Sequence, residues 1–377
     1  MRPAQKPDGT LYYEYVLCYV DDVLIISMDP DGIADELKEH FVLKEVLDPA
    51  VKRERYLGAT IGKFTFPDGS YGWYMSAKEY LSHAIPAIEA IWDEKLYQKA
   101  SSPLMGDYHP ELDISPLLSD DDAQLFASYI GILQWAVELG RIDLTQSVSL
   151  MSRFRTAPRE GHMAAVLHIF GYIKSHLNSK IVLDPAYRKW SHINWHEDAE
   201  WKEFYPDAAE PIPPHAPEPR GKDAQINIYC DAAHATCLAT RRSTTGIIVF
   251  LNGAAIKWYS KRQNTVESST FGSEFVALKI AMEMNCAIRY KLRMMGVPVE
   301  GPSYVLGDNQ SVITNVTNPV SQLSKRHNAI AYHKCREEVA AGAALLAFES
   351  GKENCSDGLT KILVGLNFRR FLDSILY

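Results

Sequence analysis

Apolar and polar positions follow two different periods in the last part of the chain, from residue 224 onward. Short β-branched runs between turn residues predict strands, and apolar positions three and four residues apart predict helices. The order of these patterns is that of a mixed α/β domain. Strands are expected at 226–231, 246–251, 255–260, 303–307 and 343–348, and helices at 272–295, 309–316, 327–341 and close to the C-terminus.

In the first part of the chain, two apolar runs meet at Asp21 and Asp22 in the string YYEYVLCYVDDVLIIS. This pattern predicts a hairpin of two strands with carboxylates at its tip. Further short strands are expected after it, with Pro67-Asp68-Gly69 as a turn. The first 75 residues are therefore expected to consist mainly of strands.

Helical patterns begin near Ser76. Ser76 and Glu79 have the spacing of a capping box, and Pro86 is expected to kink the helix or to end its first part. Residues 120–177 carry apolar positions at helical spacing, which predicts packed helices. Six prolines follow between residues 205 and 221. So dense a group predicts an extended, semi-rigid spacer that marks a domain boundary.

The composition is that of an ordinary globular protein, with 46% hydrophobic and 23% charged residues among 377. No apolar run has the length of a membrane span, and the N-terminus does not open a signal peptide. The six cysteines include no CxxC pair and indicate reduced thiols. We therefore expect an intracellular protein without a membrane partner, in the cytoplasm or the nucleus.

The net charge of −8 is distributed unevenly along the chain. Residues 222–377 hold 18 Lys and Arg against 13 Asp and Glu, a balance of +5, so residues 1–221 carry −13. The segment with the α/β pattern is thus the basic part of an acidic chain. This asymmetry weakly favours a polyanionic partner.

Four carboxylates in the basic segment stand at the ends of predicted elements. Asp231 and Asp308 end strand-like runs, Glu274 opens a helical pattern, and Asp357 precedes the final short helix. Acids that converge from scattered elements form a cage for a divalent cation, and Mg²⁺ prefers hard oxygen ligands of this kind. The pattern favours a metal centre that cuts phosphodiesters.

Strings from nearly the whole chain match one family in order, namely YVDDVLI, YLGATI, RIDLTQSVSLMSRF, YCDAAHA, RRSTTGIIVF, GSEFVAL, DNQSV and SDGLTK. The chain resembles the C-terminal part of the polyprotein of copia-type LTR retrotransposons, which joins a reverse transcriptase to a ribonuclease H. The resemblance implies the C-terminal part of a reverse-transcriptase palm at 1–75, a helical thumb and connection at 76–184, a proline-rich linker at 185–223, and a ribonuclease H-like domain with a mixed five-stranded sheet at 224–377.

The same resemblance implies roles for the acids. The four carboxylates of the basic segment become catalytic metal ligands that hold two Mg²⁺ ions, with Mn²⁺ as the alternative, and cleave the RNA strand of an RNA–DNA hybrid. Asp21 and Asp22 become two of three polymerase carboxylates. The third is expected upstream of this chain, together with the fingers and half of the palm. Asp21 and Asp22 are therefore expected to be relics without polymerase activity, unless another chain supplies those parts.

Three positions depart from the family pattern. Ala233 stands where a second Asp is usual, and no histidine precedes Asp357 where retroviral ribonucleases H carry one. Gly358 replaces an aliphatic residue, which is expected to loosen the final helix. The acid replaced by Ala233 is not one of the four expected ligands, so activity is expected to survive that change. Copia-type members also lack the histidine, so product release is expected to be managed in another way.

Contacts to nucleic-acid phosphates are expected from basic, hydroxyl and amide residues near the acids. The candidates are Arg241, Arg242, Ser243, Thr244, Lys261, Arg262, Gln263, Asn309 and Gln310.

Two other functions stay open at this point. One is a decayed or domesticated element fragment that at most binds nucleic acid, and the other is a different two-metal nuclease or integrase with the same fold. Metal-dependent cleavage of a hybrid would exclude the first, and cleavage of duplex DNA would indicate the second.

Overall fold

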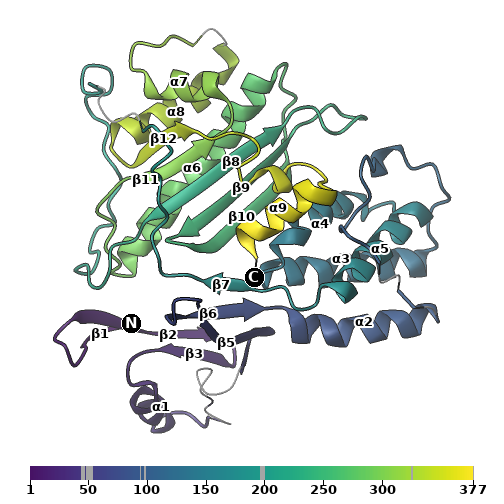
Figure 1. The fold of residues 1–377 in the computed structure, drawn as a ribbon, viewed down its shortest axis with the longest axis horizontal. Coiled ribbons are helices and arrows are strands. Elements are labelled where there is room, and N and C mark those ends of the chain that lie inside the picture. Colours follow the sequence, from purple (N-terminus) through teal and green to yellow (C-terminus); the bar gives the residue numbers. More distant parts are fainter. Residues whose placement is uncertain are drawn as a thin grey trace.

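The computed structural model describes residues 1–43, 47, 54–93, 95–96, 99–195, 200–323 and 326–376 of the chain. Its strands form three sheets, of three, four and five strands, with helices around them (Figure 1). This mixed α/β architecture confirms the expected fold class. None of the helices in these ranges is long and apolar enough to cross a membrane.

The N-terminal sheet consists of three antiparallel strands and is followed by one helix, with the bounds β1 (Arg2–Gln5), β2 (Leu11–Tyr19), β3 (Asp22–Ile26) and α1 (Pro30–Lys38). The hairpin expected around Asp21 and Asp22 is confirmed, because Tyr19 pairs with Asp22 across the turn between β2 and β3. The sheet touches the rest of the molecule through tyrosines of β2. Tyr15 Oη, for example, donates a hydrogen bond to the carbonyl of Met295 at 2.7 Å.

The second sheet is antiparallel, in the order β4 (Glu54–Tyr56), β5 (Ala59–Thr65), β6 (Tyr71–Ser76) and β7 (Ile181–Leu183). The turn predicted at Pro67-Asp68-Gly69 joins β5 to β6, and Gly69 has a φ of 84° that glycine adopts without strain. The capping box predicted at Ser76 is wrong. Ser76 ends β6, its hydroxyl donates to the carbonyl of Ser179, and the next helix begins at Lys78 without a side-chain cap.

The helical region between β6 and β7 contains α2 (Lys78–Trp92), η1 (Pro110–Leu112), α3 (Asp120–Glu138), η2 (Ile142–Leu144), α4 (Thr145–Met151), η3 (Ser152–Phe154) and α5 (Glu160–Ser175). The packed helices expected over 120–177 are confirmed, with Phe126, Leu133 and Phe170 fully buried. Pro86 does not end its helix, since α2 continues through it to Trp92.

The described residues between β7 and residue 225 form neither helix nor strand. This proline-rich strap is nevertheless attached to the following region. Glu210 forms ion pairs with Arg289 and Arg293, the former at 2.6 Å, and Trp190 Nε1 donates to Asn227 Oδ1 at 3.2 Å. The strap is therefore extended, as its proline content predicts, but held along the surface that it crosses.

The five-stranded sheet has the order β10-β9-β8-β11-β12, with β8 (Ile226–Ala233) at its centre and β9 (Thr244–Leu251), β10 (Ala254–Arg262), β11 (Ser303–Gly307) and β12 (Ala344–Phe348) around it. The pairs among β8, β9 and β10 are antiparallel, whereas β11 runs parallel to both β8 and β12. The expected mixed five-stranded sheet is thus confirmed, and each predicted strand end lies within two residues of the observed one.

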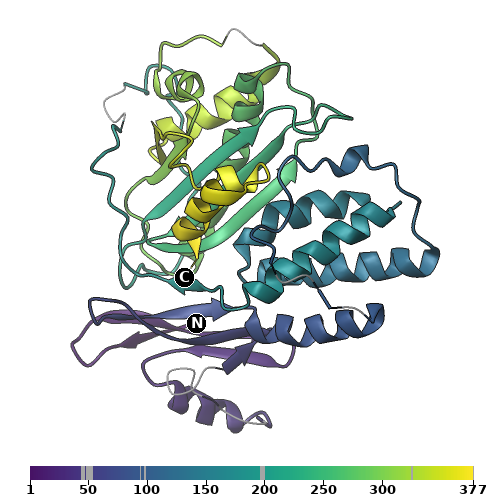
Figure 2. The ribbon, with the colours of Figure 1, turned by 45° about the vertical axis from the view of Figure 1, so that its right-hand side comes forward.

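Helices cover both faces of this sheet, as Figure 2 shows. One face packs on α6 (Thr270–Met294), α7 (Gln310–Thr317) and α8 (Ala329–Ala340), which follows η4 (Arg326–Asn328). The other face carries η5 (Asp357–Leu359), α9 (Gly365–Ile375) and the helical region. On that second face, Tyr229, Ile248 and Phe250 join Phe126 and Leu133 in a single hydrophobic core. The sheet and the helical region therefore share one interior.

Candidate metal centre

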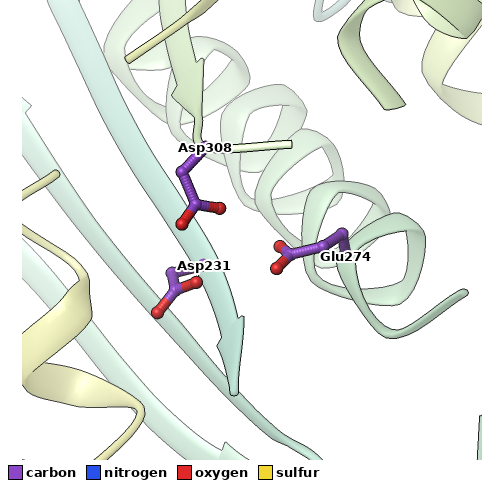
Figure 3. A group of neighbouring side chains, drawn as sticks. All are labelled: Asp231, Glu274 and Asp308. Carbon is purple, nitrogen blue, oxygen red and sulfur yellow. The ribbon is translucent and has the colours of Figure 1, made fainter. Parts of the chain in front are cut away.

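Three carboxylates converge at one end of the five-stranded sheet (Figure 3). Asp231 lies in β8, Glu274 in the first turns of α6, and Asp308 directly after β11. One possible ligand oxygen of each lies within 4.8 Å of those of the other two. Over the part of the chain that the structure describes, no other set of three acidic, histidine or cysteine residues meets this criterion. The three acids are therefore the candidate metal centre.

Strand register and the start of a helix account for this convergence. β11 runs parallel to β8, and Gly307 pairs with Cys230 at the end of their contact, so Asp308 follows one residue later beside Asp231. Glu274 belongs to α6, which packs on β8. That helix begins after Ser269, whose side chain accepts a hydrogen bond from the backbone N–H of Gly272.

The three carboxylates are crowded, with Asp231 buried and Glu274 and Asp308 partly buried. Asp231 is 5% exposed, and burial together with the charges of Asp308 and Asp357 raises its pKa to about 6. Burial, and then the charges of Asp231 and Asp308, raise the pKa of Glu274 to about 9. Burial and the charge of Asp357 also raise the pKa of Asp308. Like charges this close disfavour ionisation, and a divalent cation would offset their repulsion.

Asp357, the fourth predicted ligand, lies in η5 beside these three acids but outside their group. Its carboxylate forms an ion pair with the ammonium of Lys361. Burial lowers the pKa of Lys361, but the hydrogen bond and the charge of Asp357 outweigh it, so that this pKa is raised. The structure thus brings three of the four predicted acids together and holds Asp357 at the margin through Lys361.

Two residues that the sequence analysis did not single out position this site. Thr360 is buried, and its Oγ1 donates to Asp231 Oδ2 at 2.6 Å. Gly246 pairs with Asp231 across β9 and β8, and a Cβ at this position would lie 2.6 Å from Thr360 Cγ2 and 2.8 Å from the carbonyl of Ser356. Thr360 could have been found from the sequence, because its hydroxyl stands in SDGLTK close to Asp357. The need for a glycine at position 246 could not, because it depends on the register between β8 and β9.

Gly358 also has a packing role. A Cβ at this position would lie 2.5 Å from Cγ of Phe371, whose ring comes from α9. Real Cβ atoms do not approach other atoms so closely, so a larger residue would force the ring or η5 to move. The glycine thus lets α9 lie directly against η5, while its expected effect on the looseness of the final helix stays a prediction.

Four of the predicted phosphate contacts are cations near the end of the sheet that carries Asp231. Arg241 and Lys261 are exposed, whereas Arg242 and Arg262 are partly buried. None of these four side chains forms an ion pair with a described residue. Their charge is therefore available to an external anion, in agreement with the basic balance of this segment.

The remaining candidates have internal partners or stand at a helix start. Ser243, Thr244 and Gln263 are buried, and Gln263 Nε2, for example, donates to Thr245 Oγ1 and to the carbonyl of Ser273. A supporting role for the turn and for α6 accounts for these three. Asn309 is the N-cap of α7, where its side chain accepts a hydrogen bond from the N–H of Val312, and the neighbouring Gln310 is exposed.

The carboxylates predicted for a polymerase site lie in a different sheet. Asp21 and Asp22 are exposed at the turn between β2 and β3, and Asp22 Oδ2 accepts a hydrogen bond from the backbone N–H of Leu57 at 3.2 Å. They belong to no group of three possible metal ligands within the described ranges. The structure thus confirms their place in a hairpin, while their role stays a prediction.

Comparison with known proteins gives relatives over nearly the whole chain, although no family model matches. The chain is 24% identical over 367 residues to the "Retrovirus-related Pol polyprotein from transposon RE1" of Arabidopsis thaliana, which covers 96% of this chain and 21% of that protein. It is 24% identical to the Pol polyprotein from transposon TNT 1-94 of Nicotiana tabacum, over 92% of this chain and 23% of that protein. The chain thus spans about a fifth of the length of these two relatives.

A shorter relative is a putative transposon Ty5-1 protein of Saccharomyces cerevisiae, 26% identical over 74% of this chain and 75% of its own length. Among solved structures, LC11-RNase H1 in complex with an RNA/DNA hybrid is 15% identical over 36% of this chain and 94% of its own, with a TM-score of 0.29. RNase H1 from Halobacterium salinarum is 14% identical over 40% of this chain and 98% of its own, with a TM-score of 0.28. The fold is defined by the sheet topology described above. On its sequence relatives, the chain is a homologue of the retrovirus-related Pol polyproteins of copia-type transposons over most of its length.

Proposed function

We propose that residues 224–377 form a ribonuclease H-type endonuclease that hydrolyses the RNA strand of RNA–DNA hybrids. One observation carries the proposal. Asp231, Glu274 and Asp308 meet within 4.8 Å at the end of a mixed five-stranded sheet, in a chain homologous to Pol polyproteins. Burial and then the charges of neighbouring acids raise the pKa values of all three carboxylates. A set of hard oxygen donors with excess negative charge fits Mg²⁺.

In this proposal the three converging acids hold the metal, and Asp357 completes the set from η5. Two divalent cations, when bound, would activate a water molecule and stabilise the leaving oxygen of the phosphodiester. The water gives up a proton as its oxygen bonds to phosphorus, the bond from phosphorus to the 3′-oxygen breaks, and the 3′-oxygen takes up a proton. Thr360 orients Asp231 through its hydroxyl, and Lys361 positions Asp357, which would serve as the fourth ligand, through their ion pair.

The substrate class follows from charge and from the relatives. Arg241, Arg242, Lys261 and Arg262 carry positive charge that no described residue pairs. This charge suits a phosphate backbone but gives no sequence preference. A hybrid is distinguished from duplex DNA by its shape and by the 2′-hydroxyls of one strand. We therefore assign an RNA–DNA hybrid, read without sequence specificity, as the substrate.

The test uses the full chain with a hybrid whose RNA strand is labelled, in the presence of Mg²⁺. Cleavage of the RNA strand is expected, with 3′-hydroxyl and 5′-phosphate ends, and EDTA should abolish it. Asp308→Asn should lower the rate by on the order of 100-fold or more, because it removes one charge from the metal site. Asp373→Asn, which changes an exposed carboxylate of α9, serves as the matched control and should leave the rate unchanged.

Three other outcomes would overturn the proposal. Hybrid binding without cleavage would indicate a non-catalytic element fragment. Cleavage of duplex DNA in preference to the hybrid would indicate a different nuclease built on the same sheet. Cleavage that persists at full rate in Asp308→Asn would place the active site elsewhere or reveal a contaminating nuclease.

A further inference from the structure

Two arginines come from neighbouring segments where the helical region meets the five-stranded sheet. α4 contacts β10, and Ser149 Oγ donates to the carbonyl of Ser260 at 2.7 Å (Figure 1). Arg153 follows α4 in η3, and Arg262 lies two residues beyond Ser260 at the end of β10. The two side chains thus come from segments that contact each other, and burial together with the charge of Arg262 lowers the pKa of Arg153 to about 10.

Neither cation is neutralised by the protein around it. Arg153 is partly buried, and its side chain has no hydrogen bond or ion pair with a described residue. Arg262 makes one weak contact, from Nη1 to Cys237 Sγ at 3.8 Å. The acid near Arg153 is Glu111, whose Oε1 already accepts hydrogen bonds from the N–H of Leu238 and from His109. Two partly buried guanidinium groups therefore have near them, among the described residues, one carboxylate that is already engaged by other donors.

Such an arrangement costs free energy unless an anion joins it. Partly buried cations without partners lose hydration, and like charges repel at short range. Guanidinium groups also bind phosphate through paired N–H donors, which suits them to a phosphodiester. The pair is thus better explained by an absent anionic ligand than by a contribution to the stability of the fold.

The pair lies on the same face of the sheet as the metal centre. Asp231, Gly246 and Ser260 are cross-strand neighbours, and Arg262 is two residues beyond Ser260, so its side chain points to the same side as that of Asp231. With strands about 4.8 Å apart and about 3.4 Å per residue, Arg262 is roughly 12 Å from Asp231. One turn of a duplex spans about 34 Å, so a duplex at the metal centre would reach the pair.

We propose that Arg153 and Arg262 form a phosphate-binding pair for the backbone of the duplex held at the metal centre. The helical region then contributes directly to substrate binding, through a residue that the sequence analysis did not list. The inference rests on the proposed function for the identity of the duplex, an RNA–DNA hybrid. It adds a second point at which the protein contacts that substrate, formed by Arg153 of the helical region and Arg262 at the end of β10.

The test measures binding of the full chain to an RNA–DNA hybrid in EDTA, so that the result does not depend on cleavage. Arg153→Gln should weaken binding by on the order of 10-fold, and should make the slope of log K against log salt shallower by about 0.9, the value for one lost phosphate contact. Arg155→Gln is the matched control, because Arg155 is exposed two residues further along and should change neither quantity. The fold loss of binding affinity in the double variant Arg153→Gln, Arg262→Gln should be smaller than the product of the losses in the two single variants, since the two arginines contact one phosphate.

Thermal unfolding separates this role from a structural one. Because Arg153→Gln relieves repulsion, its midpoint should equal or exceed that of the wild type. A lower midpoint would show that Arg153 stabilises the fold, and would overturn the inference. Equal effects of Arg153→Gln and Arg155→Gln on binding would also overturn it, whereas the proposed function would stand as long as Asp308→Asn abolishes cleavage. A wild-type chain that does not bind the hybrid would refute both.

Discussion

At the scale of single residues, the hydroxyl of Thr360 is the clearest support for the metal centre. It donates to Asp231 at 2.6 Å and so holds that carboxylate in one orientation. Thr360→Val keeps the shape of the side chain but removes this donor. We expect a loss of 10- to 100-fold in Mg²⁺ affinity, which is typical when a partner of a metal ligand is removed. Titration of the cleavage rate with Mg²⁺ measures this change.

Thr360→Ser is the matched control for this prediction, because it retains the hydroxyl and loses only a methyl group. Its Mg²⁺ dependence should be close to that of the wild type. If Thr360→Val and Thr360→Ser behaved alike, the hydrogen bond to Asp231 would have no part in metal binding, and Thr360 would matter only for packing.

The raised pKa of Glu274 predicts how the metal-free protein responds to pH. The pKa moves from 4.5 to about 9 in the folded chain, so between these values the folded state binds more protons than the unfolded state. Stability from this group therefore falls as pH rises. In EDTA, the unfolding midpoint of the wild type should fall by several degrees relative to Glu274→Gln between about pH 5 and pH 9, since 1 kcal/mol corresponds to roughly 2 °C or more.

Added Mg²⁺ should reverse this trend in the wild type, because the cation favours the ionised carboxylates. Glu274→Gln should respond more weakly to the metal. A difference between the two proteins that does not depend on pH would mean that Glu274 is not held among like charges.

Residue identities at this site could be predicted from the sequence only in part. The four acids stand in short strings that resemble known ones, so they were recognisable without a structure. Thr360 and Gly246 act through contacts between distant parts of the chain, which no local pattern reveals. Likewise, Ser243 and Gln263 carry polar groups that suit phosphate, but the fold buries them and gives them internal partners.

At the scale of elements, strands and helices after residue 224 could be predicted closely, because each apolar run is bounded by turn residues. The prediction failed at Ser76, where the local spacing of a capping box was outweighed by a hydrogen bond to Ser179, 103 residues away. At Gly358, low helix propensity suggested a loose end, and no local pattern showed the packing role of the glycine. The close approach of Phe371 to Gly358, again a tertiary contact, decides that position.

The contact between η5 and α9 predicts a specific defect. In Gly358→Ala the added methyl group would meet the ring of Phe371, so that η5 or α9 must shift. We expect a loss of about 1–3 kcal/mol in the free energy of unfolding, the usual cost of overpacking, together with reduced cleavage because Asp357 moves with η5. Denaturant unfolding and hybrid cleavage measure the two effects.

A second substitution tests the cause of that defect. Gly358→Ala combined with Phe371→Leu gives the methyl group room, and should recover part of the cleavage rate relative to Gly358→Ala alone. An equal or larger loss of activity in the double variant would show that the ring is not what excludes a side chain at position 358.

At the scale of the whole molecule, the helical region and the sheet share a hydrophobic core, although sequence patterns assigned them to separate segments. Tyr229, Ile248 and Phe250 are at most 4% exposed because the helical region and α9 cover them. Patterns along the chain locate elements and linkers, but they do not show which apolar faces meet. The domain limits inferred from the proline-rich strap therefore stay a prediction from sequence. The shared core indicates that the helical region and the sheet are less independent of each other than separate domains would be.

This shared core predicts that a fragment of residues 185–377 is much less stable than one of residues 76–377. Removing the helical region exposes several large apolar side chains of the sheet, each worth about 1.5–3 kcal/mol when buried. Their sum is comparable to the whole stability of a typical domain, about 5–15 kcal/mol. We expect the shorter fragment to associate or to unfold at low denaturant concentration, whereas the longer one unfolds cooperatively near the midpoint of the full chain. Equal midpoints for the two fragments would show that the sheet needs only α6 to α9 for its stability, and that the helical region serves the substrate alone.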